Sequence, residues 1–225
     1  MAPPKITVLD SLTNSQLDKL IKISMEAFTG DPLSDAMTAG IPKLKEDLYR
    51  LTFRATALEG RIFVCQDNRD IVSVAACFEP GFKFLGSEAQ RSLGLYKLLE
   101  SLPEETRQWW NKIVSDDSSP YSAQSYVDFS QFSGGEKQEK VPECWTVVVM
   151  ATSVSEQGKG YGTSIMKEIC KKAAANAKSI RLNASPEINV SFYGSLGFRV
   201  VKRTEDESPS GVKLVNTIMV WEAQE

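Results

Sequence analysis

The chain has 225 residues, and its 26 Lys and Arg against 29 Asp and Glu give a formal net charge of −3, with an apolar content of 42% that is ordinary for a globular protein. Its basic residues are scattered, which argues against a nucleic-acid partner, because such binding calls for a basic face. Histidine is absent, which excludes Ser-His-Asp and Cys-His catalysis and every histidine-ligated metal site.

The N-terminal third of the chain alternates helical periodicity with short strand patterns. Residues 71–78 are nearly all apolar, which is typical of a central strand covered on both faces. The expected elements are, in order, a strand at 5–9, a helix from 13 or 14 to 28, a helix at 42–58, and strands at 61–66 and 71–78 around a hairpin turn at 67–70.

Residues 82–142 lose the strand pattern and are predicted to form an insertion with helices at 88–99 and 103–114. The polar stretch 115–140 is rich in Ser, Asp, Gln and Gly and is longer than most loops inside a compact domain. It is interpreted either as a lid or substrate wall, or as a plain surface loop.

The C-terminal part alternates strands and helices again. The expected elements are a strand at 144–154, a helix at 159–178, a strand at 179–184, a short helix from 186 to 197, a strand at 198–202, a turn at 206–211 and a strand at 212–221. The whole pattern predicts an α+β fold of the mixed α/β three-layer kind, with a central mixed sheet of about seven strands. Residues 1–225 are expected to form a single domain.

The four cysteines, Cys65, Cys77, Cys144 and Cys170, have no C-x-x-C spacing, so they are predicted to be buried reduced thiols and not metal ligands. No apolar run approaches the roughly 18 residues of a membrane span, and the N-terminus lacks the pattern of a signal peptide. We therefore expect a cytoplasmic protein without a membrane partner.

The glycine-rich run Gln157-Gly158-Lys159-Gly160-Tyr161-Gly162 joins a predicted strand to a predicted helix. The start of a helix leaves backbone N–H groups unpaired and partly positive, so such a turn predicts an anion site. The spacing fits neither a Walker A loop nor the G-x-G-x-x-G dinucleotide fingerprint. The alternative interpretation is a turn that only starts a helix.

Two motifs together carry a family resemblance. The run Q-x-x-G-x-G, with Gln157, Gly160 and Gly162, resembles the pyrophosphate-binding signature of the GNAT acyltransferase superfamily. About 35 residues later, Phe192-Tyr193 followed by Leu196-Gly197-Phe198 resembles the F-Y-x-x-L-G-F ending of the same fold. The resemblance is strong over 144–198 and weak over 61–78.

Within the superfamily the chain resembles the puromycin N-acetyltransferase type of small-molecule enzyme. Asn189 lies four residues before Tyr193, Trp145 lies twelve residues before Gln157, and a helical insertion separates the third and fourth strands. Common members carry an asparagine where this chain has Pro186, which puts that contact to the pantetheine arm in doubt or moves it to Asn183 or Asn189.

The resemblance implies acetyl-CoA as cofactor, bound between the strands at 144–154 and 180–184. It also implies Tyr193 as the general acid that protonates the leaving thiolate, against the alternative of a packing residue. Thr163 can be interpreted either as a contact to the coenzyme or as an ordinary residue of the first helical turn. The coenzyme contacts implied are Met150, Ala151, Thr152, Gln157, Gly158, Lys159, Gly160, Tyr161, Gly162, Thr163, Asn183 and Asn189.

The acceptor side is less defined by the sequence. An alkylammonium has a pKa of about 10, so a carboxylate or a chain of waters must remove its proton. The candidates for this base are Asp31, Glu79 and Glu143, each with an alternative as an ordinary turn or surface residue. Phe28, Asp31, Trp109 and Trp110 are candidates for the substrate wall, with core packing as the alternative.

The predicted function is therefore acetyl transfer from acetyl-CoA to a primary amine of a small molecule, by direct attack of the amine. Two alternatives stay open. One is a protein acetyltransferase acting on lysine or N-termini, and the other is a coenzyme-binding module without catalysis. The protein is expected to be a monomer or a homodimer.

Overall fold

The structure is a computed structural model that describes residues 4–115 and 143–223. Its elements are β1 (Lys5–Leu9), α1 (Asn14–Ala27), α2 (Pro32–Thr38), α3 (Pro42–Glu59), β2 (Arg61–Asp67), β3 (Asp70–Phe78), α4 (Glu88–Arg91), α5 (Leu95–Ser101), α6 (Glu104–Ser115), β4 (Trp145–Thr152), the 3-10 helix η1 (Val154–Glu156), α8 (Tyr161–Ala174), β5 (Ile180–Ala184), α9 (Glu187–Gly194), β6 (Arg199–Glu207) and β7 (Lys213–Trp221).

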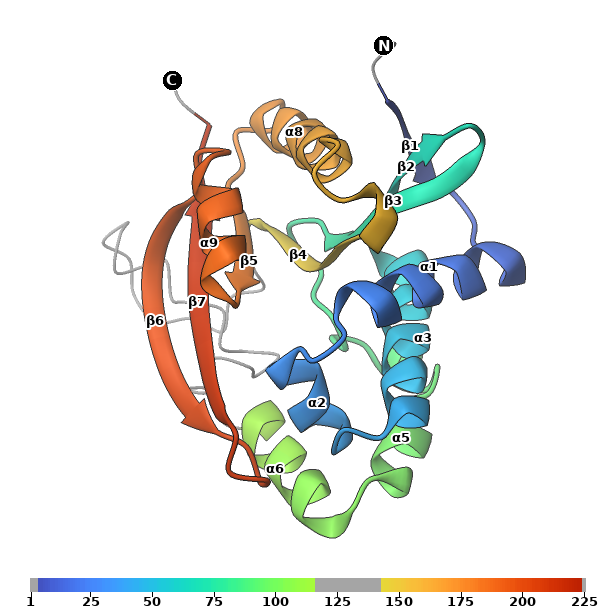
Figure 1. Ribbon diagram of the computed structural model, residues 1–225, viewed down its shortest axis with the longest axis vertical. Helices are drawn as coiled ribbons and strands as arrows, with labels where there is room; N and C mark the ends of the chain where they lie inside the picture. Colours follow the sequence, from blue (N-terminus) through green and yellow to red (C-terminus); the bar gives the residue numbers. More distant parts are fainter. Residues whose placement is uncertain (1–3, 116–142, 224–225) are drawn as a thin grey trace.

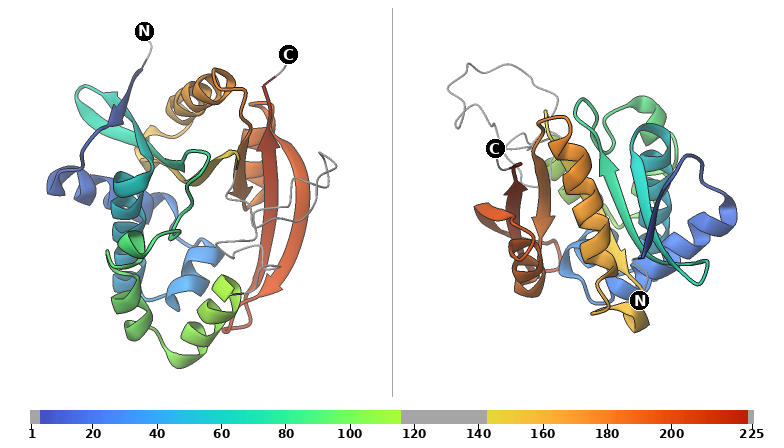
Figure 2. Two further views of the ribbon diagram at one scale, coloured as in Figure 1. Left: turned by 180° about the vertical axis from the view of Figure 1, so that it is seen from behind. Right: turned by 90° about the horizontal axis from the view of Figure 1, so that it is seen from above.

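The strands form one mixed sheet in the order β1-β2-β3-β4-β5-β7-β6, which confirms the predicted fold class. Only β4 and β5 run parallel, and every other neighbouring pair is antiparallel. The long β6–β7 hairpin extends along one side of the molecule toward α6 (Figures 1 and 2).

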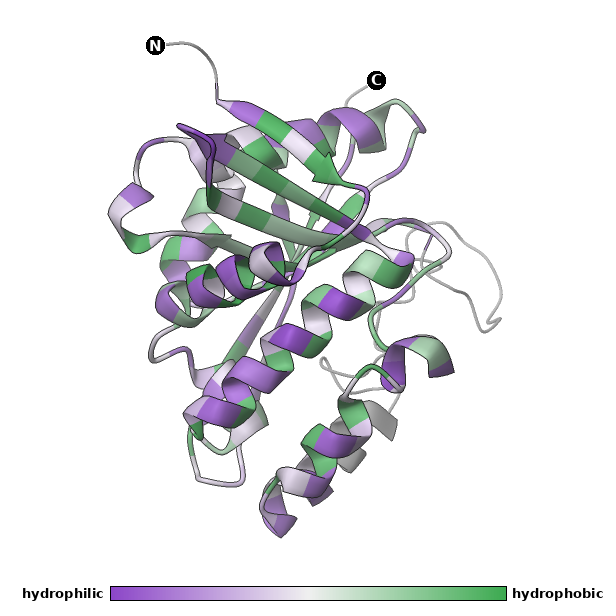
Figure 3. Ribbon diagram, turned by 90° about the vertical axis from the view of Figure 1, so that its right-hand side faces the viewer, coloured by the Kyte–Doolittle hydropathy of each residue, from purple (hydrophilic) through white to green (hydrophobic). Residues whose placement is uncertain are grey.

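Two apolar cores lie on opposite faces of the sheet. On one face, Ile165 and Ile169 of α8 and Val190 of α9 pack with strand residues such as Phe63 and Trp145. On the other face, residues of α1 and α3 pack with Ile62, Val64, Val74 and Ala76. Hydrophilic and hydrophobic residues alternate along the helices, as expected where each helix has one buried stripe (Figure 3).

The helical insertion has a core of its own against α3. Leu44, Leu48 and Leu51 of α3 pack with apolar residues of α5 and α6, among them the buried Trp110. The indole N–H of Trp110 donates a 2.7 Å hydrogen bond to the carbonyl of Met37, which fastens α6 to α2. The predicted polar stretch at 115–140 lies almost wholly outside the described residues.

Helix α2 was not predicted, and the prediction of a single helix at 88–99 was wrong. Pro32 indicates the end of α1, but it also occupies the first turn of α2, whose N-cap is Asp31. The helix expected at 88–99 is two helices, α4 and α5, because Gly94 between them has φ 152°, which a helix cannot accommodate.

The C-terminal boundaries also differ from those expected. Helix α8 begins at Tyr161 and not at 159, because Gly158 and Gly160 have φ of 76° and 85°, and it ends at Ala174. Strand β6 continues to Glu207, so the predicted turn at 206–211 begins later, at Ser208, whose N–H donates to the carbonyl of Val212. Helix α9 ends at Gly194, before the expected 197.

Other expectations about the described residues are confirmed. The hairpin turn between β2 and β3 has positive φ at Asn68 and Arg69, the geometry that joins tightly twisted strands. All four cysteines are free, and three are buried. Within the described ranges no helix is both long enough and apolar enough to cross a membrane.

Candidate functional site

Strand β4 contains a bulge at Val148. Its register against β3 places Val147 opposite Cys77 and Val149 opposite Ala76, so Val148 is the extra residue. The bulge reverses the faces of the strand: Val147 packs beneath α8, whereas Val149 packs with the core of α1. It therefore changes the course of β4 in its middle.

Strands β4 and β5 separate directly after this point. They pair in parallel only between 145–147 and 180–182. Beyond the bulge, β4 pairs with β3 alone up to Thr152, and β5 pairs with β7 up to Ala184. The sheet is therefore open between the C-terminal halves of these two strands, where the sequence analysis expects the coenzyme.

The open edge of β4 presents unpaired backbone groups. The N–H of Ser153 donates to Val72 of β3, so by alternation Met150 and Thr152 direct their N–H and C=O groups toward the opening. The carbonyl of Thr152 accepts a 3.2 Å hydrogen bond from the Gln157 side chain. Such an edge fits an extended, amide-bearing arm of the kind found in coenzyme A.

The glycine turn after β4 presents a continuous set of backbone donors. Among the described residues, no N–H from Gly158 to Thr163 donates a hydrogen bond, and the first helical bond of α8 runs from Ser164 to Gly160. The turn is exposed, and the positive end of the α8 dipole lies at the same place. This arrangement fits a pyrophosphate.

Gly162 brings the start of α8 close to the end of β4. A Cβ atom at this position would lie 3.0 Å from the terminal methyl of Met150 and 3.6 Å from the Thr152 hydroxyl. A side chain here would therefore press on the residues that line the opening.

The charged and aromatic neighbours of the turn are exposed or half-buried. Lys159 forms a 3.0 Å ion pair with Glu156, and this hydrogen bond raises the pKa of Lys159. The Tyr161 pKa is raised first by desolvation and then by the negative charge of Asp67. Lys159 is thus a cation beside the donor turn, and its present partner is the partly buried carboxylate of Glu156.

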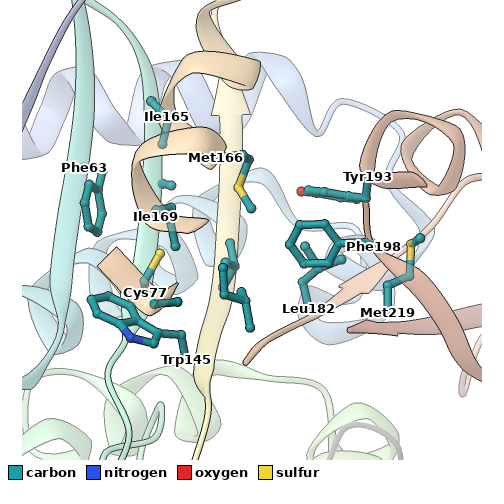
Figure 4. Close-up of a cluster of buried hydrophobic side chains, with 14 of the residues drawn as sticks. Phe63, Cys77, Trp145, Ile165, Met166, Ile169, Leu182, Tyr193, Phe198 and Met219 are labelled. Carbon is teal, nitrogen blue, oxygen red and sulfur yellow. The ribbon is translucent and has the colours of Figure 1, made fainter. Parts of the chain in front are cut away.

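Tyr193 on α9 is buried in the core that α8 and α9 form with the sheet. Its ring contacts Phe192 and Phe198 edge-on, at centroid distances of 5.0 and 5.6 Å. Figure 4 shows its hydroxyl directed toward Met166 of α8. Within the described part of the chain that hydroxyl has no hydrogen-bond partner, and burial raises the pKa of Tyr193 above its usual range. The side chain therefore holds a neutral O–H available to another group.

The two candidate asparagines differ in their surroundings. Asn189 on α9 donates a 3.0 Å hydrogen bond to the carbonyl of Ser185, which leaves its side-chain oxygen as the atom that can accept. Asn183 on β5 is exposed. Both lie on the β5–α9 side, across the opening from β4.

Three residues predicted for the acceptor side, as wall or base, are each engaged in local structure. Phe28 stacks on Tyr49, with ring centroids 5.8 Å apart. The Asp31 carboxylate accepts a 2.8 Å hydrogen bond from the Ser34 N–H as the cap of α2. Glu79 forms a 2.8 Å ion pair with Arg61. Phe28 and Asp31 lie together near the α1–α2 junction, whereas Glu79 lies at the end of β3.

A hollow of about 630 Å³ lies between α2, the start of α6 and the β6–β7 turn. Asp35, Glu104 and Glu105 give its wall three carboxylates. Lys45 on α3 is buried and pairs with Asp35. The described residues contain no group of three or more His, Cys, Asp or Glu side chains placed to hold a metal ion.

Sequence reasoning missed several residues of this acceptor side. Tyr49 and Lys45 have no motif, because they lie on an ordinary apolar stripe of α3. Burial raises the pKa of the Tyr49 phenol, which lies close to Ser34, Asp31 and Asp35. The one available signal was Asp31-Pro32, which is typical of a helix start and would have revealed α2.

Comparisons with known proteins agree with this geometry. Residues 138–220 match the family model described as the acetyltransferase (GNAT) domain. No curated protein matches the sequence. Several solved structures share the fold over nearly the whole chain.

Three of them are acetyltransferases by their descriptions. Arylalkylamine N-acetyltransferase 2 from Aedes aegypti is 16% identical with a TM-score of 0.61, covering 97% of this chain and 99% of that one. The histone acetyltransferase HPA2 and related acetyltransferase from Corynebacterium glutamicum is 19% identical with a TM-score of 0.59, covering 99% and 98%. A polyamine N-acetyltransferase from Drosophila melanogaster is 13% identical with a TM-score of 0.55, covering 97% and 100%.

At these identities the structural likeness establishes the fold, and the family model matches the C-terminal part of the chain. The matched residues hold β4, the glycine turn, α8 and Tyr193, which are the parts of the site built above. The chain therefore has a GNAT-like fold, and its residues 138–220 match the GNAT acetyltransferase domain.

Proposed function

We propose that the protein transfers the acetyl group of acetyl-CoA to a primary amine of a small molecule. The observation that carries the proposal is the open edge of β4 continuing into the unpaired N–H groups of residues 158–163. Backbone donors in this order suit an extended amide arm followed by a pyrophosphate.

The residues of the chain divide the work of binding. We assign the arm to backbone groups of Met150 and Thr152, since those of Ala151 between them face β3. We assign the pyrophosphate to the turn from Gln157 to Thr163. Asn183 and Asn189 are assigned to the opposite wall. When bound, acetyl-CoA supplies a thioester that an uncharged amine attacks directly.

Tyr193 is the proposed general acid. Its O–H would donate a proton to the sulfur of the leaving thiolate. The support for this role is its burial, its raised pKa, and the absence of any hydrogen-bond partner for the hydroxyl within the described residues.

A small amine is favoured over a protein acceptor because the insertion narrows the acceptor side. Helix α6 is held against α2 by the Trp110 hydrogen bond, and these two helices and the β6–β7 turn line the hollow. The solved structures of similar fold include enzymes described as acting on arylalkylamines and polyamines. The carboxylates of the cavity wall suit a cationic acceptor.

Three finer points belong to the same proposal. Within the family, we propose that the chain is similar to the puromycin N-acetyltransferase type, with Asn189 in contact with the coenzyme. Trp145, the other residue of that resemblance, is 3% exposed and packs against Phe63, so it serves the core. Residues 1–225 are proposed to be one domain with the insertion at 82–142. A cytoplasmic location is proposed as well.

The test is thiol release from acetyl-CoA across a panel of amines and lysine peptides, run beside thermal unfolding with acetyl-CoA. We expect a rise in melting temperature and turnover with one class of small amine. No thermal shift would disprove the coenzyme site. A shift without turnover on any acceptor would favour a binding module, and turnover only on peptides would favour the protein acetyltransferase.

A further inference from the structure

Strand β6 is an edge of the sheet with an open outer side. It pairs with β7 on one side, and no other strand of the described ranges lies against it. Most of its residues are exposed. The N–H of Ser208 donates back to Val212, so by alternation Arg203 and Glu205 direct their backbone groups outward. An open edge of this kind can pair with another strand.

The charges of β6 are divided between its two halves. Arg199, Lys202 and Arg203 lie in the first half, and Glu205, Asp206 and Glu207 fill the second. An antiparallel copy of the same strand would place basic residues opposite acidic ones. We infer that β6 pairs with β6 of a second copy of this chain, across a two-fold axis at Thr204, to form a continuous sheet.

The register follows from the direction of the backbone groups. Residues directly opposite one another in an antiparallel pair must both point outward or both point inward, so the two-fold axis passes through a residue. An axis at Arg203 or at Glu205 would place like charges opposite each other. An axis at Thr204 places Thr204 opposite its own copy and Arg203 opposite Glu205, twice.

The same register gives further favourable pairs. Lys202 lies opposite Asp206, and Arg203 exchanges backbone hydrogen bonds with Glu205 on both sides of the axis. Threonine pairs and pairs of opposite charge are among the stabilising neighbours in antiparallel sheets. The bulge between Val200 and Lys202 ends the pairing at one side.

The existing partners of these charges do not prevent the pairing. Arg203 forms a 3.0 Å ion pair with Glu187, and Glu205 forms a 2.6 Å ion pair with Lys213. The Arg203 and Glu205 side chains remain 50% and 62% exposed, and exposed ion pairs contribute little.

The alternative is that the charges protect the edge against association, as charged edge strands do in many proteins. Sedimentation equilibrium over a wide range of protein concentration separates the two. We expect a concentration-dependent dimer for the unmodified chain. A monomer at every concentration would overturn the inference.

Reversing or swapping the charges at positions 203 and 205 tests the charge arrangement. Arg203→Glu places Glu opposite Glu205 of the second copy and is expected to weaken dimerisation at least tenfold. The double variant Arg203→Glu with Glu205→Arg restores opposite charges and is expected to dimerise again. Failure of the double variant to dimerise, with an unchanged circular dichroism spectrum, would refute the register.

Glu187→Lys is the matched control. It breaks the ion pair of Arg203 inside the chain and leaves the edge charges in place, so dimerisation should persist. If Glu187→Lys weakens the dimer as much as Arg203→Glu does, the effect comes from the internal pair and the inference fails. The measurement does not depend on acetyl transfer, so it stands apart from the proposed function.

Discussion

The proposed donor side and the proposed acceptor side of the site are built in different ways. The donor side is backbone: the free edge of β4 and the N–H groups of the turn before α8, continuous in sequence over 150–163. The acceptor side is side chains from α1, α2, α3, α6 and the β6–β7 turn, which are distant in sequence. A site made of backbone groups requires glycines at fixed spacing before a helix. A site made of side chains requires only that the packed elements form a suitable pocket, so it leaves no fixed spacing in the sequence.

The largest effect should come from the donor turn. Gly160→Val places a β-branched residue at φ 85°, which shifts the turn and misdirects its N–H groups. Losing two charge-assisted hydrogen bonds costs about 3 kcal/mol or more, which raises the KM for acetyl-CoA by roughly 100-fold. Initial rates against acetyl-CoA concentration measure it.

Gly81→Val is the control for this change, because Gly81 also has positive φ and open space around its Cα, away from the donor turn. It should lower the free energy of unfolding by about 1–3 kcal/mol, as Gly160→Val does, and leave the KM for acetyl-CoA unchanged. An unchanged KM in Gly160→Val would show that this turn does not hold the coenzyme.

The next effect concerns Tyr193, the side chain that belongs to the donor side. Tyr193→Phe should reduce kcat by about 10- to 100-fold with both KM values unchanged, since a thiolate needs less protonation than most leaving groups. Stability should be preserved, because within the described residues the hydroxyl makes no hydrogen bond. Tyr96→Phe, an exposed tyrosine on α5 whose hydroxyl donates to Glu88, is the control.

The pH dependence gives a second measurement on the same residue. Burial raises the Tyr193 pKa, so the protonated acid persists above the pH at which an ordinary tyrosine ionises, about 10. The kcat of the unmodified protein should therefore not fall between neutral pH and pH of about 10 through loss of this acid. A fall in that range that disappears in Tyr193→Phe would contradict the raised pKa.

The same division explains what the sequence could predict. The spacing Gln157, Gly160, Gly162 and the later Tyr193 specify backbone conformation and chain order, and so they predict the donor side. Helix α2 was not predicted because Pro32 ends one helix and starts the next within a few residues. The roles of Tyr49 and Lys45 depend on the packing of α3 against α2, which no local pattern records.

A substitution at Trp110 should weaken the contact between α6 and α2 on the acceptor side without changing the donor side. Trp110→Phe keeps an aromatic ring in the insertion core but leaves the Met37 carbonyl without its donor. We expect a loss of about 1–3 kcal/mol of stability and a several-fold higher KM for the amine, with the KM for acetyl-CoA unchanged. Chemical denaturation and steady-state kinetics measure both.

Trp109→Phe is the neighbouring control for the loss of an indole, since Trp109 is only partly buried. Equal increases of both KM values in Trp110→Phe would mean that the two sides are coupled, and the comparison between them would have to be abandoned.

The smallest effect is expected at Asp31, where capping and catalysis can be separated by choice of residue. Asp31→Ala removes the bond from the Ser34 N–H and should cost about 1 kcal/mol. Asp31→Ser keeps an N-cap acceptor but removes the carboxylate, so it should retain both stability and turnover. If turnover in Asp31→Ser instead falls at least tenfold while its melting temperature is retained, the carboxylate itself acts on the amine. Asp31 would then be the general base, and the acceptor side would supply chemistry as well as shape.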